Sequence, residues 1–283
     1  MAERIGERAA NRALLARQGL LAPFEWPLVE VVEAIGAIQA QHWPAVAAAL
    51  AARMDRFDLA ELEAALGHGE LVFGTLLRGT LHVVSAREHP AYAAVTAASG
   101  ADDWRRATKE AVPGGEALRR EIAAFAAEAA RTADELSDLL ERRLAAEPDL
   151  LPVAEAERQR ALRWPLRRWS GLVRVPADGR WSKAPADYRA APGGEAARGL
   201  DPKAALDEVA RRHLRAFGPA AAEDVAAWAG CRAGEARAAL DRLAPELLRL
   251  EDDAGKPLFD LPDAPRPEGD TPAPPRLLPW FDS

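Results

Sequence analysis

The sequence has very little cysteine and no long hydrophobic run. Its single cysteine, Cys231, excludes an intrachain disulfide and favours a reducing compartment. The first 20 residues are charged and amphipathic, unlike the apolar core of a signal peptide. No other stretch approaches the length of apolar sequence that a membrane span requires. We therefore expect a cytoplasmic protein with no membrane partner.

Residue patterns that identify several kinds of catalytic site are also missing. The five histidines are scattered and lack the spacing of metal ligands. The sequence has no phosphate-binding loop, no glycine-rich dinucleotide motif and no nucleophile elbow. We therefore expect no metal, no nucleotide cofactor and no other cofactor. Serine-dependent hydrolysis and nucleotide hydrolysis are not expected either.

Helix-forming residues are abundant instead. Nearly half of the residues are hydrophobic, which is typical of a globular protein, and alanine, arginine, leucine and glutamate favour helices. Three times along the chain, predicted helices are followed by a predicted β-hairpin, at 71–84, 171–182 and 247–261. This order predicts a mainly α fold with small β-hairpin wings, built from tandem winged helix-turn-helix units.

The repeated pattern gives the expected domain organisation. The third unit is the clearest, because Gly230 separates two short helices as in a helix-turn-helix. After it comes a stretch rich in proline, glycine and acidic residues, which is typical of a linker, and then the truncated start of a C-terminal segment. The predicted divisions are 1–98, 99–200 and 201–262 for the three winged-helix units and 263–283 for the remainder.

Two glutamines, Gln39 and Gln41, are the main candidates for chemistry. The helix predicted from Pro27 ends close to them, because Pro44 disfavours helical geometry at Trp43. On a helix, side chains two residues apart point about 200° apart around the axis. On extended backbone they point the same way. We therefore expect the two amides side by side, on a loop between two helices.

Three motifs resemble those of the AlkZ-like, or YcaQ-like, winged-helix DNA glycosylases, and the resemblance covers the whole chain. They are Gln39-Ala40-Gln41, the hairpin Leu77-Arg78-Gly79-Thr80-Leu81-His82-Val83-Val84, and Phe217-Gly218-Pro219-Ala220 with Asp224 and Trp228. The first two together are fairly specific, whereas the third recurs among other winged-helix proteins. Two features depart from the family pattern. Ala40 is smaller than the usual aliphatic residue, and the chain ends at Ser283, where the family continues into a C-terminal β-barrel.

The resemblance implies DNA repair by hydrolysis of the N-glycosidic bond of bulky or crosslinked alkylated purines in double-stranded DNA. A ring-alkylated purine is cationic and leaves readily, so it needs less acid assistance than an ordinary glycoside. By the resemblance, Gln39 and Gln41 are the catalytic residues, since two amides can orient a water molecule. No lysine near Gln39 is available as a Schiff-base nucleophile. A monofunctional glycosylase is therefore expected, which leaves abasic sites without strand cleavage.

The predicted DNA contacts fall into two groups. Arg78, Thr80 and His82 belong to the first wing and His42 adjoins the glutamines, although the wing residues equally fit an exposed strand face. The second group is a basic stretch with Trp164 and Trp169 interleaved, which equally fits a solvated helix face paired with nearby glutamates. Its basic candidates are Arg158, Arg163, Arg167 and Arg168. With a net charge of −7, any DNA-binding surface depends on where such cations gather.

Two other classes of function fit parts of the sequence. A non-catalytic winged-helix DNA-binding protein, such as a transcriptional regulator, would bind selected sequences and would not need Gln39 or Gln41, which could simply close a helix. An interaction scaffold would show no salt-dependent affinity for DNA. The mixed charges of 232–242 favour a scaffold role for the third unit over sequence-specific recognition.

Overall fold

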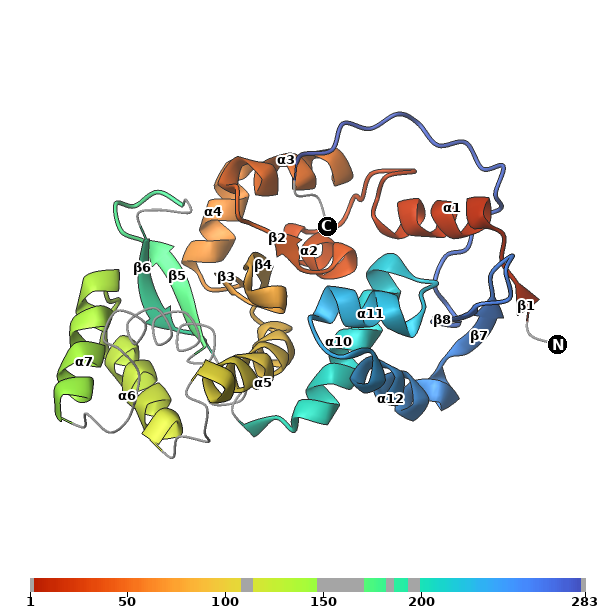
Figure 1. The fold of residues 1–283 in the computed structure, drawn as a ribbon. Coiled ribbons are helices and arrows are strands. Elements are labelled where there is room, and N and C mark those ends of the chain that lie inside the picture. The colour runs from red at the N-terminus through yellow and green to blue at the C-terminus, as the bar shows by residue number, and fades with distance from the viewer. Residues whose placement is uncertain (1–2, 108–113, 147–170, 182–185, 193–198, 281–283) are drawn as a thin grey trace.

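The computed structural model describes residues 3–107, 114–146, 171–181, 186–192 and 199–280. As predicted, the chain is mostly helical with small sheets (Figure 1). The helices are α1 Glu7–Arg17, α2 Leu28–Ile35, α3 Trp43–Arg53, α4 Leu59–Gly67, α5 His89–Ala107, α6 Gly114–Glu128, α7 Ala133–Ala146, α10 Pro202–Phe217, α11 Ala222–Ala229 and α12 Ala233–Leu243. Within the described residues, no helix has both the length and the apolarity needed to cross a membrane.

Five of the eight strands among the described residues form one antiparallel sheet in the order β2-β4-β3-β5-β6. The strands are β1 Glu3–Arg4, β2 Ile38–Gln39, β3 Leu71–Thr75, β4 Leu81–Ser85, β5 Leu172–Pro176, β6 Ala186–Ala190, β7 Leu248–Glu251 and β8 Pro257–Asp260. The first predicted hairpin is β3–β4, and Gly74 of β3 pairs with Val173 of β5. The first two hairpins thus share a sheet, and the predicted division at 98/99 falls inside α5.

This sheet separates two hydrophobic cores. Along β3 and β4 the side chains alternate, so that Phe73 and Val83 pack with α2, α3 and α4 on one face. Val72 and Val84 pack on the other face, with α5, α10, α11 and α12. A third, smaller cluster joins α6 and α7 to β5 and β6. The third unit therefore packs against the face of the sheet opposite α2–α4.

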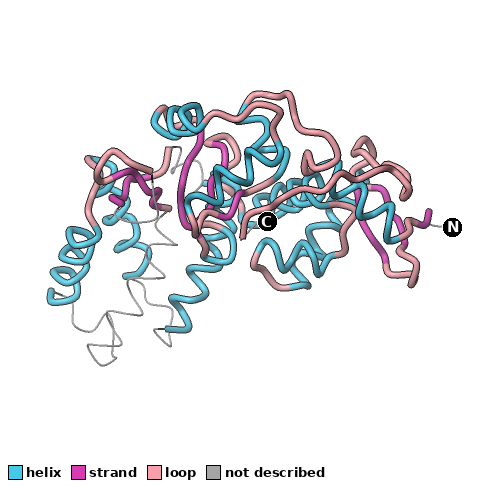
Figure 2. Tube along the Cα trace, turned by 90° about the horizontal axis from the view of Figure 1, so that it is seen from above, coloured by secondary structure: helices cyan, strands magenta, loops and turns pink. Residues whose placement is uncertain are grey.

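The second sheet contains β1, β7 and β8 and lies apart from the first (Figure 2). Its β7–β8 hairpin is the third predicted wing, and it follows α10, α11 and α12 in the expected order. The N-terminal strand β1 was not predicted from the sequence. It pairs in parallel with β7, Glu3 opposite Leu250, so the start of the chain completes the sheet of the third unit.

The second hairpin forms, but the predicted position of its return strand is wrong. We expected that strand at 180–182, whereas β6 begins at Ala186. Asp178 accepts a hydrogen bond from the Arg180 backbone N–H, which makes a local turn that does not return directly to the sheet. Trp181 instead stacks against Trp43 of α3, with 6.3 Å between ring centroids.

The segment predicted as a linker has irregular backbone but lies against α1 (Figure 1). The backbone carbonyl of Thr271 accepts a hydrogen bond from Arg12 at 2.6 Å, and that of Pro265 accepts one from Arg17 at 3.3 Å. Further along, Arg276 donates to the carbonyl of Leu20. Side chains of α1 thus bind the backbone of this segment, which is more ordered than its composition indicated.

Candidate functional site

The two glutamine side chains lie side by side at the edge of the five-stranded sheet. Gln39 belongs to edge strand β2, and its Nε2 donates a hydrogen bond to Oε1 of Gln41 at 2.5 Å. Both residues are half-buried. The expected pairing of the amides is therefore present. The predicted helix end is wrong, however, because α2 ends at Ile35 and Gln39 lies on a strand rather than in a loop.

Gly36 makes the transition from α2 to β2. Its φ of 82° lies in the left-handed region, which a side chain rarely permits. A Cβ atom here would stand 3.2 Å from the Phe217 ring and 3.4 Å from the Trp228 ring. Glycine thus allows both the change of chain direction and the close approach of the third unit.

His82 is the neighbour of Gln39 on the next strand. Gln39 is paired with His82, and the Ala40 N–H donates to the Leu81 carbonyl at 2.7 Å. This ladder bond makes Gln39–His82 a non-hydrogen-bonded pair, the kind in which facing side chains lie closest. Only 1% of His82 is exposed, so the expectation of an exposed strand face is wrong at this position.

The protonation state of His82 follows from its surroundings. Its Nδ1 lies 2.9 Å from the backbone carbonyl of Thr80, and because a carbonyl can only accept, Nδ1 carries the hydrogen. Burial lowers the pKa of His82 to about 4, so the ring is neutral near pH 7. A neutral imidazole therefore stands beside Gln39, under the first wing.

The tip of the first wing is anchored to the third unit. Arg78 adopts a left-handed backbone with φ 56°, and its guanidinium donates to the Trp228 carbonyl at 2.5 Å. Burial lowers the pKa of Arg78, although the residue as a whole is exposed. Thr80, half-buried, donates from its hydroxyl to the carbonyl of Leu77. The turn that carries two predicted DNA contacts is therefore held in a single position.

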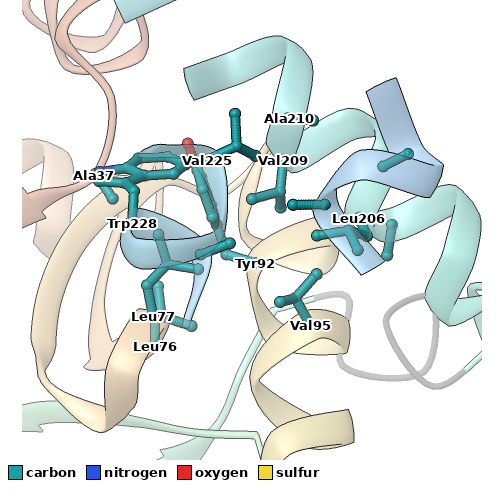
Figure 3. Close-up of a cluster of buried hydrophobic side chains, with 14 of the residues drawn as sticks. Ala37, Leu76, Leu77, Tyr92, Val95, Leu206, Val209, Ala210, Val225 and Trp228 are labelled. Atoms are coloured by element: carbon teal, nitrogen blue, oxygen red, sulfur yellow. The ribbon is translucent and has the colours of Figure 1, made fainter. Parts of the chain in front are cut away.

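An aromatic cluster packs against the segment that leads into strand β2. Figure 3 shows Trp228 beside Ala37, two residues before Gln39, with Leu76 and Leu77 of the wing close by. The ring of Trp228 makes an edge contact with Tyr92 at 5.9 Å and tilted contacts with Phe217 and His213. Trp228 therefore acts here as a packing anchor.

The remaining predicted contacts differ in position. His42 is exposed and precedes α3. Trp43 is half-buried and packs against Phe73, with ring centroids 5.4 Å apart. The basic candidates Arg158, Arg163, Arg167 and Arg168 lie outside the described residues.

The site contains amides and a neutral ring rather than strong acids, bases or metal ligands. Across the described ranges, no group of three or more histidine, cysteine or acidic side chains could hold a metal ion. Burial raises the pKa of Cys231 to about 11, so this thiol is a poor nucleophile. The glutamine pair can orient a water molecule or a polar substrate group by hydrogen bonds.

Two buried polar residues behind the site, Gln18 and Arg53, were not found from the sequence. Both are almost fully buried, 3% and 2% exposed, and they contact each other although they are 35 positions apart. The available signal was weak: Gln18 precedes a glycine at the end of a helix, and Arg53 ends a helix of otherwise apolar residues.

Comparison with known proteins identifies the family. A sequence model of the AlkZ-like DNA glycosylases matches residues 32–283. No curated protein matches the chain. Among solved structures, the DNA glycosylase AlkZ of Streptomyces sahachiroi has a similar fold, with a TM-score of 0.74 and 23% identity over 92% of this chain and 71% of that chain. Because the family match covers most of its length, this chain belongs to the AlkZ-like DNA glycosylase family and has the role of a DNA repair glycosylase.

Proposed function

We propose that this protein hydrolyses the N-glycosidic bond of bulky or crosslinked alkylated purines in double-stranded DNA. The observation that carries the proposal is the hydrogen bond between the amides of Gln39, on edge strand β2, and Gln41, two residues further on. An amide is not a base near neutral pH, but it donates and accepts hydrogen bonds. The pair would orient water toward the sugar while a cationic purine departs without acid assistance.

The proposed reaction is monofunctional. The first lysine in the sequence is Lys109, so the segment that carries the glutamines has no amine for a Schiff base. Of the described lysines, Lys256 is ion-paired with Glu223 at 3.5 Å, and Lys203 lines a pocket beside Cys231 in the third unit. Water is therefore the proposed nucleophile, and the product is an abasic site in an uncut strand.

The proposed DNA contacts are His42, Arg78 and Thr80. His42 directly follows Gln41, and Arg78 and Thr80 lie in the hairpin whose strand β4 pairs with β2. His42 and Arg78 are exposed, and Arg78 has further donors besides the one bound to Trp228. We leave His82 out of this group, because a buried ring offers no surface to DNA. It supports Gln39 instead. The basic candidates at 158–168 remain a prediction from the sequence.

The tandem winged-helix organisation is also part of the proposal. The order of helices α10, α11 and α12 followed by the β7–β8 hairpin supports it for the third unit. For the first two units the support is weaker, because their hairpins belong to the same sheet. In this organisation the third unit acts as a scaffold that holds the first wing.

Base release from a duplex that carries a ring-alkylated guanine tests the proposal. Wild type should release the base, and Gln39→Ala and Gln41→Ala should each be slower by about 100-fold, because the water is no longer oriented. Both variants should melt and bind DNA like wild type. Alkali should be required to cut the product strand. Equal release by the variants would contradict the assigned residues, and DNA binding by wild type without release would favour the non-catalytic alternative.

A further inference from the structure

Gln18 caps the C-terminal end of helix α1, with its side chain in the protein interior. The next residue, Gly19, has a φ of 66° and packs so tightly that a Cβ atom would stand 2.7 Å from the Phe24 ring. The same Cβ would stand 3.0 Å from the Arg53 carbonyl. The tight turn at Gly19 therefore places Gln18 close to the end of α3.

The Gln18 amide joins the C-terminal ends of three helices. Its Nε2 donates to the carbonyl of Ile35, the last residue of α2, at 3.2 Å and to that of Ala216, near the end of α10, at 2.9 Å. Its Oε1 accepts from Nε and Nη2 of Arg53, the last residue of α3, at 3.3 and 3.2 Å. Carbonyls in a last helical turn lack partners within their own helix, so a buried amide is well suited to bind them.

This junction constrains the backbone that carries the glutamines. The ends of α2 and α3 are linked through the Gln18 amide and the Arg53 side chain, so residues 36–42 must run back along α3 to reach its first residue, Trp43. The 11 residues of α3 span about 16 Å, whereas seven residues in helical geometry would rise only about 10 Å. Seven extended residues reach more than about 20 Å. The connection therefore cannot be helical throughout. It includes the extended strand β2, Ile38–Gln39, and the Gln39 and Gln41 amides meet on one side of it.

We propose that Gln18 is a positioning residue for the Gln39–Gln41 pair. It holds the helix ends at a separation that keeps the intervening segment extended and paired with β4. This inference rests on the proposed glycosylase function of the pair. Without the amide, the carbonyls of Ile35 and Ala216 lose their buried donor, and the junction loosens behind the site.

The preceding residue provides a matched control. Arg17 is also buried, 4% exposed, and donates to both carboxylate oxygens of Asp260, at 2.7 and 2.8 Å, and to the Leu214 carbonyl. These bonds tie α1 to α10 and β8, but they do not reach α2 or α3. Substitution of Arg17 therefore removes a comparable buried network and leaves the junction behind the glutamines in place.

The test compares Gln18→Met, which keeps the side-chain length, with Gln18→Asn, a milder change, and with Arg17→Met. Three quantities are measured: single-turnover base release at saturating enzyme, the Kd for DNA, and hydrogen exchange of the Ala40 amide, whose N–H donates to Leu81. We expect Gln18→Met to slow base release at least about tenfold with an unchanged Kd. In Gln18→Met, the Ala40 amide should exchange faster than the variant's loss of global stability alone would predict. The increase should be smaller in Gln18→Asn. Arg17→Met should be less stable but should keep the base-release rate per folded molecule and the protection of Ala40.

Two results would overturn the inference. One is wild-type base release and wild-type Ala40 protection in folded Gln18→Met. The other is an equal loss of base release and of Ala40 protection in Arg17→Met, which would mean that general destabilisation explains the behaviour of Gln18→Met. If wild type itself releases no base, the proposed function fails, but Ala40 exchange still decides whether Gln18 positions the segment.

Discussion

At the scale of single residues, Arg78 combines an unfavourable backbone conformation with a favourable contact. A left-handed conformation costs a non-glycine residue about 1–2 kcal/mol. Its guanidinium donates to the Trp228 carbonyl at 2.5 Å, and the backbone of Arg78 lies 3.1 Å from where a Cβ on Gly230 would be. The contact with α11 offsets the backbone cost and fixes the wing tip.

Replacement of Arg78 by methionine should therefore have two separate effects. Loss of the bond to Trp228 should lower the free energy of unfolding by about 1–2 kcal/mol. Loss of a cation facing DNA should reduce the slope of log affinity against log salt by about one unit. Urea unfolding and salt titration of DNA binding measure the two effects. Arg249→Met, another exposed arginine, is the control. An unchanged salt slope would remove Arg78 from the DNA-contacting residues.

At the scale of elements, the transition from α2 to β2 depends on Gly36. Alanine there would combine a positive φ with a contact of 3.2 Å to the Phe217 ring. Such strain costs about 1–3 kcal/mol before any crowding is added. Because Ile38 and Gln39 follow Gly36 closely in the chain, a backbone shift that relieves the strain would displace β2.

We predict that Gly36→Ala lowers both the unfolding free energy and the rate of base release. Gly69→Ala is the matched control, because Gly69 has a φ of 77° but open space around its missing Cβ. Gly69→Ala should lower the unfolding free energy by less than Gly36→Ala does. It should leave the rate of base release unchanged. Chemical unfolding and single-turnover kinetics decide the comparison. Equal rates in the two variants would mean that the geometry of this transition does not limit the chemistry.

At the scale of the whole molecule, buried ionisable groups make stability depend on pH. Burial lowers the pKa of His82, His89 and His213 to about 4 each. Burial also raises the pKa of Glu88 to about 7, even though Arg212 lies 2.8 Å away. The histidines and the glutamate shift in opposite directions, so their effects on stability must be compared.

Between pH 6.5 and about 4, the unfolded chain binds protons at the three histidines that the folded chain does not bind. The stability that these buried neutral histidines contribute is fully present above pH 6.5. It is lost as the pH falls from 6.5 toward about 4. Glu88 acts in the opposite sense, since between about 7 and 4.5 only the folded state holds its proton. Three groups outweigh one, so the unfolding free energy should fall by roughly 3 kcal/mol from pH 7 to pH 5.

Urea unfolding at several pH values measures this decrease, and His213→Leu provides its internal check. Neither ring nitrogen of His213 has a hydrogen-bond partner among the described residues. Leucine should therefore be tolerated at pH 7 and should make the pH dependence shallower. If the unfolding free energy of the variant depended on pH as steeply as that of wild type, His213 would not titrate as its burial requires.

The sequence predicted the elements whose signals are local. Helix α10 has such signals at both ends, because Asp201 caps it, Pro202 suits a first turn and Gly218 ends it. Thr132 and Glu135, three positions apart, form a capping box at the start of α7, a signal that lies within four residues. The pairing of Gln39 and Gln41 was also predictable, because alternation along extended backbone needs only the two residues and a helix boundary.

Features that depend on distant residues were not predictable. Strand β1 forms only because β7, almost 250 positions later, offers an edge. The end of α2 at Ile35 depends on contacts of Gly36 with the third unit. Likewise, burial of His82 requires the helices that cover the second face of the sheet. Patterns in a single sequence carry no information about such distant partners. The first hairpin was therefore predicted, but not the helices that pack against it.

The ion pair of Arg17 with Asp260 has a consequence for biosynthesis. The two residues are separated by 243 positions, so Arg17 waits for its partner while that length of chain is synthesised. At about 5–20 residues per second, that delay is roughly 12–50 seconds. The partner strand of β1 and the α10 carbonyl bound by Gln18 are also made late. By the proposed role of Gln18, the glutamine pair therefore matures only after α10 has been synthesised, and a shorter nascent chain does not present a finished site to DNA.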